Sequence, residues 1–218
     1  MNYAPVLSAA ALLAASFAAV GAQAQSFQPE AKGTFMVNVR ASDVFSDADN
    51  PITTDAGVDT GLHVHVGNSV MPTLGFTYFV TSHIAVEAIL GTTQHSIYAV
   101  SPTGASTEVA STWVLPPVID VQYHPFPTSR LSPYVGIGVN LMFYYAGSNY
   151  NGFNVSLGDN VGFALDAGAD VAISGPWSLN IDAKKIFTST SANINDGILH
   201  SDVELDPWVL SLGFGRKF

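Results

Sequence analysis

The last thirteen residues of the chain alternate between two kinds of side chain. Counting back from the end, one row holds Phe218, Arg216, Phe214, Leu212, Leu210 and Trp208, and the other holds Lys217, Gly215, Gly213, Ser211, Val209 and Pro207. A two-residue period with one large apolar row indicates a β-strand with one apolar face. In a soluble sandwich that face would meet a core, whereas in a transmembrane barrel it meets lipid, with aromatic residues at both interfaces. Residues 208–218 match the roughly 9–11 residues that a strand needs to cross a bilayer, so the stretch favours a barrel.

The composition excludes several other classes of protein. Charged residues are 11% of the chain, well below the roughly 25% of soluble domains. Past the N-terminal leader the sequence has no run of about 18 apolar residues, which excludes helical membrane spans. A net charge of −10 argues against a nucleic acid partner, because phosphates attract a basic surface. The chain has no cysteine, so no disulfide or thiol-held cofactor is expected.

The N-terminus resembles a secretory signal peptide. Residues 6–20 are a short run rich in Ala and Leu, and Ala22-Gln23-Ala24 matches a signal peptidase site. We therefore expect residues 1–24 to be cleaved and residues 25–218 to form the mature protein. No Lys or Arg precedes the run, so either the true start lies upstream or this leader is atypical. A membrane anchor helix is the alternative, which the short length and high alanine content disfavour.

Eight segments of the mature chain alternate in the same way, with long and short connections in turn. They are residues 35–45, 70–80, 84–97, 112–124, 133–145, 161–174, 177–188 and 206–218. In three of them two aromatic residues lie ten places apart on one row, namely Trp113 and Tyr123, Trp177 and Phe187, and Trp208 and Phe218. Such pairs are typical of strands that end in two interfacial aromatic belts. The sequence therefore predicts an all-β fold, an eight-stranded antiparallel up-and-down transmembrane β-barrel. The barrel must be closed, because an open sheet edge in lipid would leave backbone groups without hydrogen-bond partners.

Several stretches along the chain resemble the outer-membrane protein W (OmpW) family. The matching stretches are Pro72-Thr-Leu-Gly-Phe-Thr-Tyr-Phe79, Ile84-Ala-Val-Glu87, Leu115-Pro-Pro117, Gln122-Tyr123, Pro133-Tyr-Val-Gly-Ile-Gly-Val-Asn140, Trp177-Ser-Leu-Asn180, Asp182-Ala-Lys-Lys185 and Asp206-Pro-Trp-Val209 with the terminal Phe218. The resemblance implies a Gram-negative outer-membrane location and passage of small hydrophobic molecules, with no catalytic residues. Its C-terminal strand is expected to contact the barrel assembly machinery, although a Tyr is common in the family where Arg216 stands.

Turning the apolar rows to lipid places the charges of the strands in the lumen. The predicted lumen charge network is Arg40, Glu87, Asp120, Asp166, Asp170, Asp182 and Lys184. Every mid-strand charge except Lys185 then avoids lipid, where a Lys or Arg at the midplane costs roughly 2–4 kcal/mol. Lys185 is expected near the outer interface, where its stem can reach the headgroups. We interpret the network as a plug, with an ion pathway as the alternative.

The outer part of the lumen is expected to be apolar. With the N-terminus periplasmic, the residues predicted to line it are Val114, Pro116, Met142, Tyr144, Ile186 and Val209. An apolar vestibule above a polar plug fits a small hydrophobic ligand, and apolar filler is the alternative. Pro116 and Pro117 cannot donate to a strand ladder, so we also expect a gap in the wall, through which a ligand could leave sideways into the bilayer.

Other signals point to weaker hypotheses. His63 and His65 could bind a metal with loop aspartates, but exposed polar surface is the simpler interpretation, and no metal site or cofactor is predicted. His95-Ser96 and His200-Ser201 could suggest a lipid-modifying enzyme, yet neither pair has a carboxylate partner at fixed spacing. The expected partners are membrane lipid and lipopolysaccharide, small hydrophobic molecules and the assembly machinery. A structural or adhesive barrel with a sealed lumen is the main rival hypothesis.

Overall fold

The computed structural model describes residues 27–218. The predicted signal peptide, residues 1–24, lies outside this range, so its cleavage stays a prediction. Within the range no helix is long and apolar enough to span a membrane.

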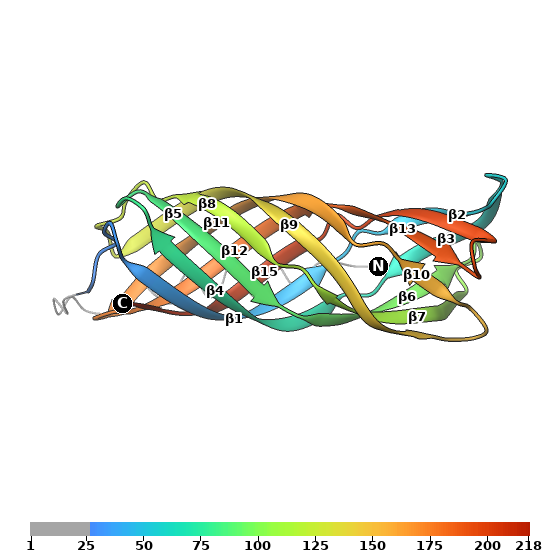
Figure 1. Cartoon of the computed structure of the whole chain (residues 1–218). Helices are drawn as coiled ribbons and strands as arrows, with labels where there is room; N and C mark the ends of the chain where they lie inside the picture. Colours follow the sequence, from blue (N-terminus) through green and yellow to red (C-terminus); the bar gives the residue numbers. More distant parts are fainter. Residues whose placement is uncertain (1–26) are drawn as a thin grey trace.

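The described chain forms one fifteen-stranded antiparallel sheet that curls into an elongated barrel (Figure 1). The strands are β1 (Phe35–Phe45), β2 (Asp49–Thr54), β3 (Asp59–Val66), β4 (Ser69–Phe79), β5 (Ile84–Gly91), β6 (Thr93–Val100), β7 (Ser106–Leu115), β8 (Val118–Tyr123), β9 (Leu131–Asn149), β10 (Val155–Leu157), β11 (Asn160–Ser174), β12 (Trp177–Phe187), β13 (Ser189–Ile194), β14 (Leu199–Glu204) and β15 (Trp208–Lys217).

Eight of these strands close a ring in the order β1, β4, β5, β8, β9, β11, β12 and β15. Each pairs antiparallel with the next. The ring closes where β15 pairs with β1, from Met36 opposite Lys217 to Phe45 opposite Trp208. The predicted eight-stranded antiparallel barrel is confirmed. We call the end where β1 begins and β15 ends the lower end, and the opposite end the upper end.

The barrel wall continues above this ring, where the sequence analysis expected long loops. Strands β2, β3, β6, β7, β10, β13 and β14 form an upper tier at the far end of the barrel in Figure 1. The expectation of loops at 101–111, 147–160 and 189–201 was wrong in large part, and the polar stretch after residue 45 forms β2 and β3. These strands are held together because many of their inward side chains, such as Ile52, Val64 and Ile97, are apolar and are buried inside the barrel in one cluster.

The two-residue period decides which side chains meet lipid. Val39, Ile137 and Leu212 point outward and are at least half exposed. Their neighbours in the inward row, such as Asn38 and Asn140, are completely buried.

Three charges lie on the outward rows of the eight ring strands. Lys185 and Arg216 were predicted on these rows, and Asp43 was not. Asp43 also faces outward near the upper end of β1, opposite Val70 and Leu210. Arg216 faces outward near the lower end of β15, with its guanidinium 5.6 Å from the Trp177 ring centre and 4.7 Å from that of Phe218. Both lie toward strand ends, where a charge can reach the headgroup region.

A charge placed midway along a strand should report the lipid contact directly. Leu212 lies near the middle of β15, so Leu212→Lys should lower the free energy of unfolding by roughly 2–4 kcal/mol, because its ammonium would face hydrocarbon. Asp43→Lys, on the same outward face but near an interface, is the matched control and should cost about 0–1 kcal/mol. Guanidinium titration of both variants in lipid vesicles measures the difference. Equal losses would contradict the assignment of this face to the bilayer.

Candidate functional site

The lower half of the lumen is filled by charged side chains, which we call the charged floor. It consists of the seven residues of the predicted network: Arg40, Glu87, Asp120, Asp166, Asp170, Asp182 and Lys184. All seven point inward from the ring and none is more than 5% exposed. An eight-stranded barrel is just wide enough for side chains to fill, and at this level they do so.

The ammonium of Lys184 is the centre of the floor. Its Nζ lies 2.8 Å from a carboxylate oxygen of Asp166, 2.9 Å from Asp182, 3.4 Å from Asp120 and 3.8 Å from Glu87. These four carboxylates come from β11, β12, β8 and β5, so one cation links strands around most of the ring. Buried charges are tolerated only when they are paired in this way.

Arg40 provides the second cation of the floor. Its Nη2 donates to Glu87 Oε1 at 2.6 Å, and its Nε donates to Asn180 Oδ1 at 2.6 Å. Thr77 also donates to Glu87 Oε1, at 3.1 Å, and the Gln122 amide donates to Glu87 Oε2 at 2.9 Å. Polar side chains from opposite walls therefore meet across the barrel.

Acids outnumber bases in the floor by five to two. Among the described residues, no hydrogen bond is made to Oδ1 of Asp166 or Oδ2 of Asp170, and Asp120 has only its ion pair with Lys184. The floor is thus a network with spare acceptors.

Above the floor the lumen opens into an apolar cavity, the vestibule. It encloses about 1350 Å³ including its open mouth. All six residues predicted for the outer lumen line it: Val114, Pro116, Met142, Tyr144, Ile186 and Val209. Arg40, Asp182 and Lys184 lie at its base.

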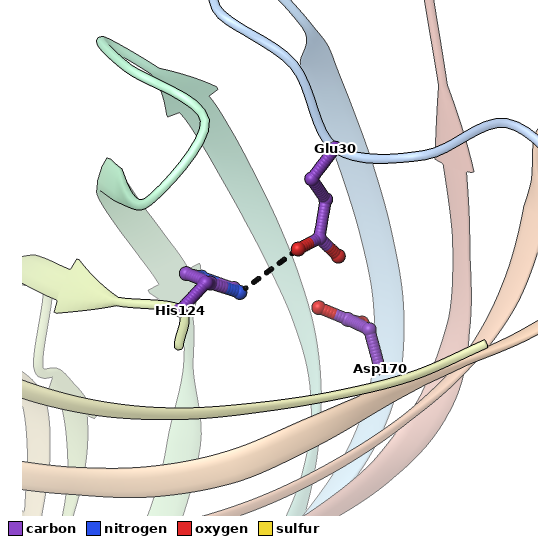
Figure 2. Close-up of side chains that lie close together, drawn as sticks. All are labelled: Glu30, His124 and Asp170. Carbon is purple, nitrogen blue, oxygen red and sulfur yellow. Dashed lines mark ion pairs between the residues drawn. The ribbon is translucent and has the colours of Figure 1, made fainter. Parts of the chain in front are cut away.

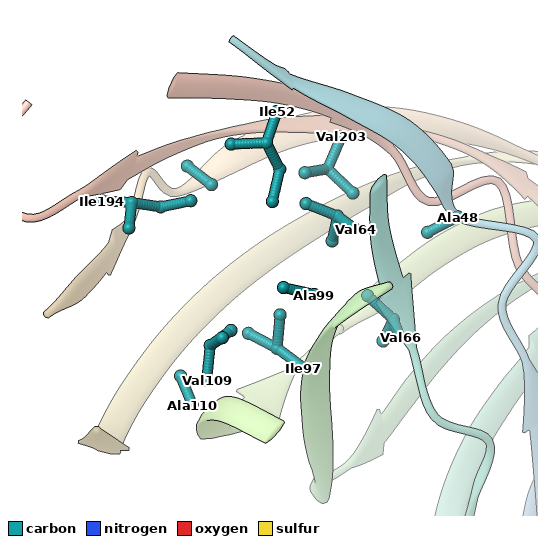
Figure 3. Close-up of a cluster of buried hydrophobic side chains, with 11 residues drawn as sticks. Ala48, Ile52, Val64, Val66, Ile97, Ala99, Val109, Ala110, Ile194 and Val203 are labelled. Atoms are coloured by element: carbon teal, nitrogen blue, oxygen red, sulfur yellow. The ribbon is translucent and has the colours of Figure 1, made fainter. Parts of the chain in front are cut away.

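The upper wall of the vestibule was missed by the sequence analysis. Figure 3 shows side chains from several strands of the upper tier pointing toward one another across the barrel. The cluster consists of Ala48, Ile52, Val64, Val66, Ile97, Ala99, Val109, Ala110, Ala192, Ile194 and Val203. The available signal was the alternation of Leu62, Val64 and Val66 with two histidines, which predicts a strand rather than a loop.

The vestibule presents few polar groups of its own. His95 faces into it with Nδ1 2.8 Å from the carbonyl of Gly67. Thr190 also faces in and donates to the carbonyl of Gly158 at 2.7 Å. Because these groups are bonded to backbone carbonyls, the cavity offers a guest mainly apolar contacts.

The wall has an interruption at Pro116 and Pro117. Pairing of β5 with β8 stops at Ile89 opposite Val118, and pairing of β6 with β7 starts at Thr93 opposite Val114. Residues 90–92 and 115–117 therefore lack cross-strand partners on this side. On the other side the Leu141 amide donates to the Pro117 carbonyl at 3.0 Å. The gap is thus one-sided, and it lies at the level where the vestibule meets the ring.

Comparison with known proteins agrees with this architecture. A sequence model of the OmpW family matches residues 31–218. The chain belongs to the OmpW family. It is 32% identical to an uncharacterised outer-membrane protein, y4mB, of Sinorhizobium fredii, over 100% of this chain and 99% of that protein. It is 34% identical to outer membrane protein W of Salmonella typhimurium, over 70% of this chain and 75% of that protein.

A solved structure supports the same conclusion. The chain is similar to the crystal structure of the outer membrane protein OprG from Pseudomonas aeruginosa, with a TM-score of 0.82, 26% identity, and coverage of 88% of this chain and 99% of that one. The OmpW-family chain is therefore a β-barrel of the outer membrane, where its apolar outer rows contact lipid.

Lys185 lies on the lipid side of the wall, near the upper edge of the ring. Its ammonium is 3.6 Å from an exposed carboxylate oxygen of Asp47 and 5.5 Å from the ring centre of Trp208. It also donates to the backbone carbonyl of Asp206. This is the interfacial position expected for a long cationic side chain.

The histidines of this OmpW-family barrel are used in different ways. His63 lies on the exposed side of β3, 3.1 Å from Asp49. His95 and Ser96 point to opposite faces of β6, while Ser201 donates to the Pro51 carbonyl and His200 bonds Asn193. In residues 27–218 neither His-Ser pair forms a hydrogen bond. His124 is completely buried at the lower end of the lumen.

Removal of the central cation should be costly. Lys184→Met should lower the free energy of unfolding by about 3–5 kcal/mol, because four buried carboxylates lose their shared partner. Lys185→Met changes the adjacent residue identically but removes only a partly exposed pair, so it should cost under about 1 kcal/mol. Denaturant titration in lipid vesicles compares the two variants. Losses of similar size would show that Lys184 does not hold the floor together.

Proposed function

We propose that this OmpW-family barrel binds small hydrophobic molecules in its vestibule and admits them across the outer membrane. The observation that carries the proposal is an apolar cavity, open at the upper end, that stops at a buried ionic network. An apolar lining of this kind suits small apolar ligands, because burial of their surface is favourable by about 25 cal/mol per Å². Val114, Pro116, Met142, Tyr144, Ile186 and Val209 would form the lower part of the binding surface.

In this proposal the charged floor acts as a plug rather than as an ion pathway. Its side chains fill the lumen, and an apolar guest that moved through it would have to separate buried ion pairs. Breaking one such pair costs about 3–5 kcal/mol. A ligand is therefore expected to leave by another route, and the unpaired wall at Pro116 and Pro117 is the opening that adjoins the vestibule.

Filling the upper vestibule should block uptake. Ala99→Trp projects a large ring into the cavity beside Val64, to which Ala99 is paired, so uptake of a small apolar probe such as naphthalene should fall severalfold toward the level of a deletion strain. Gln94→Trp, on the outward face of the same strand, is the matched control and should transport normally. Whole-cell uptake of labelled naphthalene measures both, with heat-dependent gel mobility as the check on folding.

Two results would favour the rival functions. If wild-type and deletion strains take up the probe equally, a structural or adhesive barrel with a sealed lumen becomes the better account. If lipid A changes in mass with the protein present, a lipid-modifying enzyme is favoured, although our proposal assigns no catalytic residue.

Closing the gap in the wall should slow release. Pro116→Val restores the backbone donor that faces residues 90–92 and keeps an apolar side chain in the vestibule, whereas the backbone of Pro117 faces β9. We expect probe uptake to drop severalfold in this variant. Pro133→Val, which replaces a proline of β9 near the lower end of the barrel, opposite Ala169, is the control and should leave uptake unchanged. Normal uptake in the repaired variant would rule out sideways exit at this position.

The other predicted partners follow from the surface. The outward apolar rows meet membrane lipid, and the exposed upper tier would adjoin lipopolysaccharide. Recognition of the C-terminal strand by the assembly machinery stays a prediction, and crosslinking from Phe218 during assembly would test it.

A further inference from the structure

We propose that Glu30, His124 and Asp170 bind a divalent transition-metal ion such as Zn²⁺ at the lower end of the lumen. Figure 2 shows their side chains pointing toward one another beneath the segment that precedes β1. One ligand atom from each lies within 4.8 Å of the others. All three residues are buried, at 2%, 0% and 2% exposure.

Three separate parts of the chain bring these groups together. Glu30 belongs to the segment 27–34, which is fixed across the lower end by backbone bonds from Gln28 to the Gly175 carbonyl and from Glu30 to the Pro127 carbonyl, each 2.9 Å. His124 follows β8, and Asp170 lies on β11. The site thus joins the start of the described chain to β8 and β11, the two strands that flank β9 in the wall.

The hydrogen bonds of Gln122 determine which nitrogen of His124 faces the site. The Gln122 amide nitrogen donates to both Glu87 Oε2 and Asp166 Oδ2, so its oxygen points at His124 Nε2, 3.4 Å away. Nε2 therefore carries a hydrogen, and Nδ1 faces the site, 3.2 Å from the Ser132 hydroxyl oxygen. A metal-binding histidine commonly donates its other N–H to such an oxygen.

His124 Nδ1 faces a carboxylate. Nδ1 lies 3.3 Å from Glu30 Oε2, a contact that either a proton on Nδ1 or a metal ion bound by both groups would stabilise. Ligands about 2.0–2.1 Å from a tetrahedral zinc ion lie about 3.3–3.4 Å apart, so the observed separation suits two ligands of one metal. The ring is held in this orientation between Phe79 and Tyr134, with ring centres 4.9 and 5.1 Å away.

Asp170 supplies the independent sign of a missing partner. Its Oδ1 accepts from the Asn180 amide at 3.0 Å, but no donor among residues 27–218 reaches the buried Oδ2. The second acidic group in the lumen, Glu87, Asp166 and Asp182, differs because the Lys184 ammonium already lies among its oxygens.

At the lower site Lys217 approaches only Glu30. Its Nζ is 3.4 Å from Oε1 of that residue, while the Ser132 hydroxyl donates to Oε2 at 2.5 Å. One imidazole and two carboxylates form a set that suits zinc, with a fourth position for water. The bound ion would anchor segment 27–34 to β8 and β11.

Isothermal titration calorimetry of ZnCl₂ into the full-length barrel tests the proposal. The protein is prepared without a polyhistidine tag and stripped with a chelator, and His63→Asn with His65→Asn removes exposed competing ligands. We expect one equivalent to bind, with a rise in the melting temperature that Mg²⁺ does not give. Asp170→Asn and Glu30→Gln should each weaken binding more than tenfold, because even the outer partners of metal ligands are worth about 10–100-fold in affinity.

Asp120→Asn is the matched control, since it removes a buried carboxylate beside Lys184 that makes no hydrogen bond to Gln122 or to the proposed site, and it should leave zinc affinity unchanged. If Asp170→Asn fails to fold, the wild-type stoichiometry and Glu30→Gln decide the matter. The proposal is overturned if the folded wild-type barrel binds no zinc, or if both ligand variants bind as tightly as the wild type. If the wild-type barrel binds no zinc, a proton on His124 is the cation that links it to Glu30.

Discussion

In hydrocarbon every backbone amide and carbonyl must find a partner within the protein, and this requirement shapes the whole molecule. It forces the eight strands of the ring to close between β15 and β1. In a closed barrel, alternate residues of a strand face lipid and lumen, so the position of a residue in this alternation decides which of the two its side chain contacts. Apolar rows therefore line the outside, and the polar residues of the same strands are gathered inside. The one-sided interruption at Pro116 and Pro117 is notable because it departs from this rule in a wall that is otherwise paired.

The lumen is divided into two chemically different halves. Below, two cations and five carboxylates lock the strands of the ring together through Lys184 and Arg40. Above, the strands extend past the bilayer and bury aliphatic residues around a cavity. A buried ionic network is not in itself a strong source of stability, but it excludes apolar molecules from the space it fills. In our account the floor therefore determines the direction in which a guest can move.

Much of the ring could be predicted from the sequence because the two-residue alternation of inward and outward side chains is visible within each segment. Arg40 and Lys184 were placed in the lumen by counting alternate residues from the apolar row, and the six residues of the lower vestibule by the same count. The upper tier could not be predicted with the same rules. Its strands are short, and outward residues such as Asp49 and His65 are common in loops. The alternation around Val64 is a local signal for a strand, but Ile52 has none of comparable length. They become a wall only when distant strands pair.

The contacts at the lower end of the lumen were still harder to predict, because they depend on the tertiary structure. His124 shares its parity with Asp120 and Gln122, a signal that could have placed it in the lumen. No local pattern indicates that Glu30 would reach it, because that contact depends on how segment 27–34 crosses the closed barrel. Asp43 was overlooked although the sequence places it in the outward row. Its charge is tolerated there because it lies near an interface.

The most direct test of a binding vestibule above a charged floor is a crystal structure of the protein soaked with a brominated naphthalene. The account predicts an anomalous bromine peak inside the barrel, among Val114, Met142 and Ile186 and above Lys184. A vestibule that holds only ordered water, or a bromine peak below the level of Lys184, would contradict it.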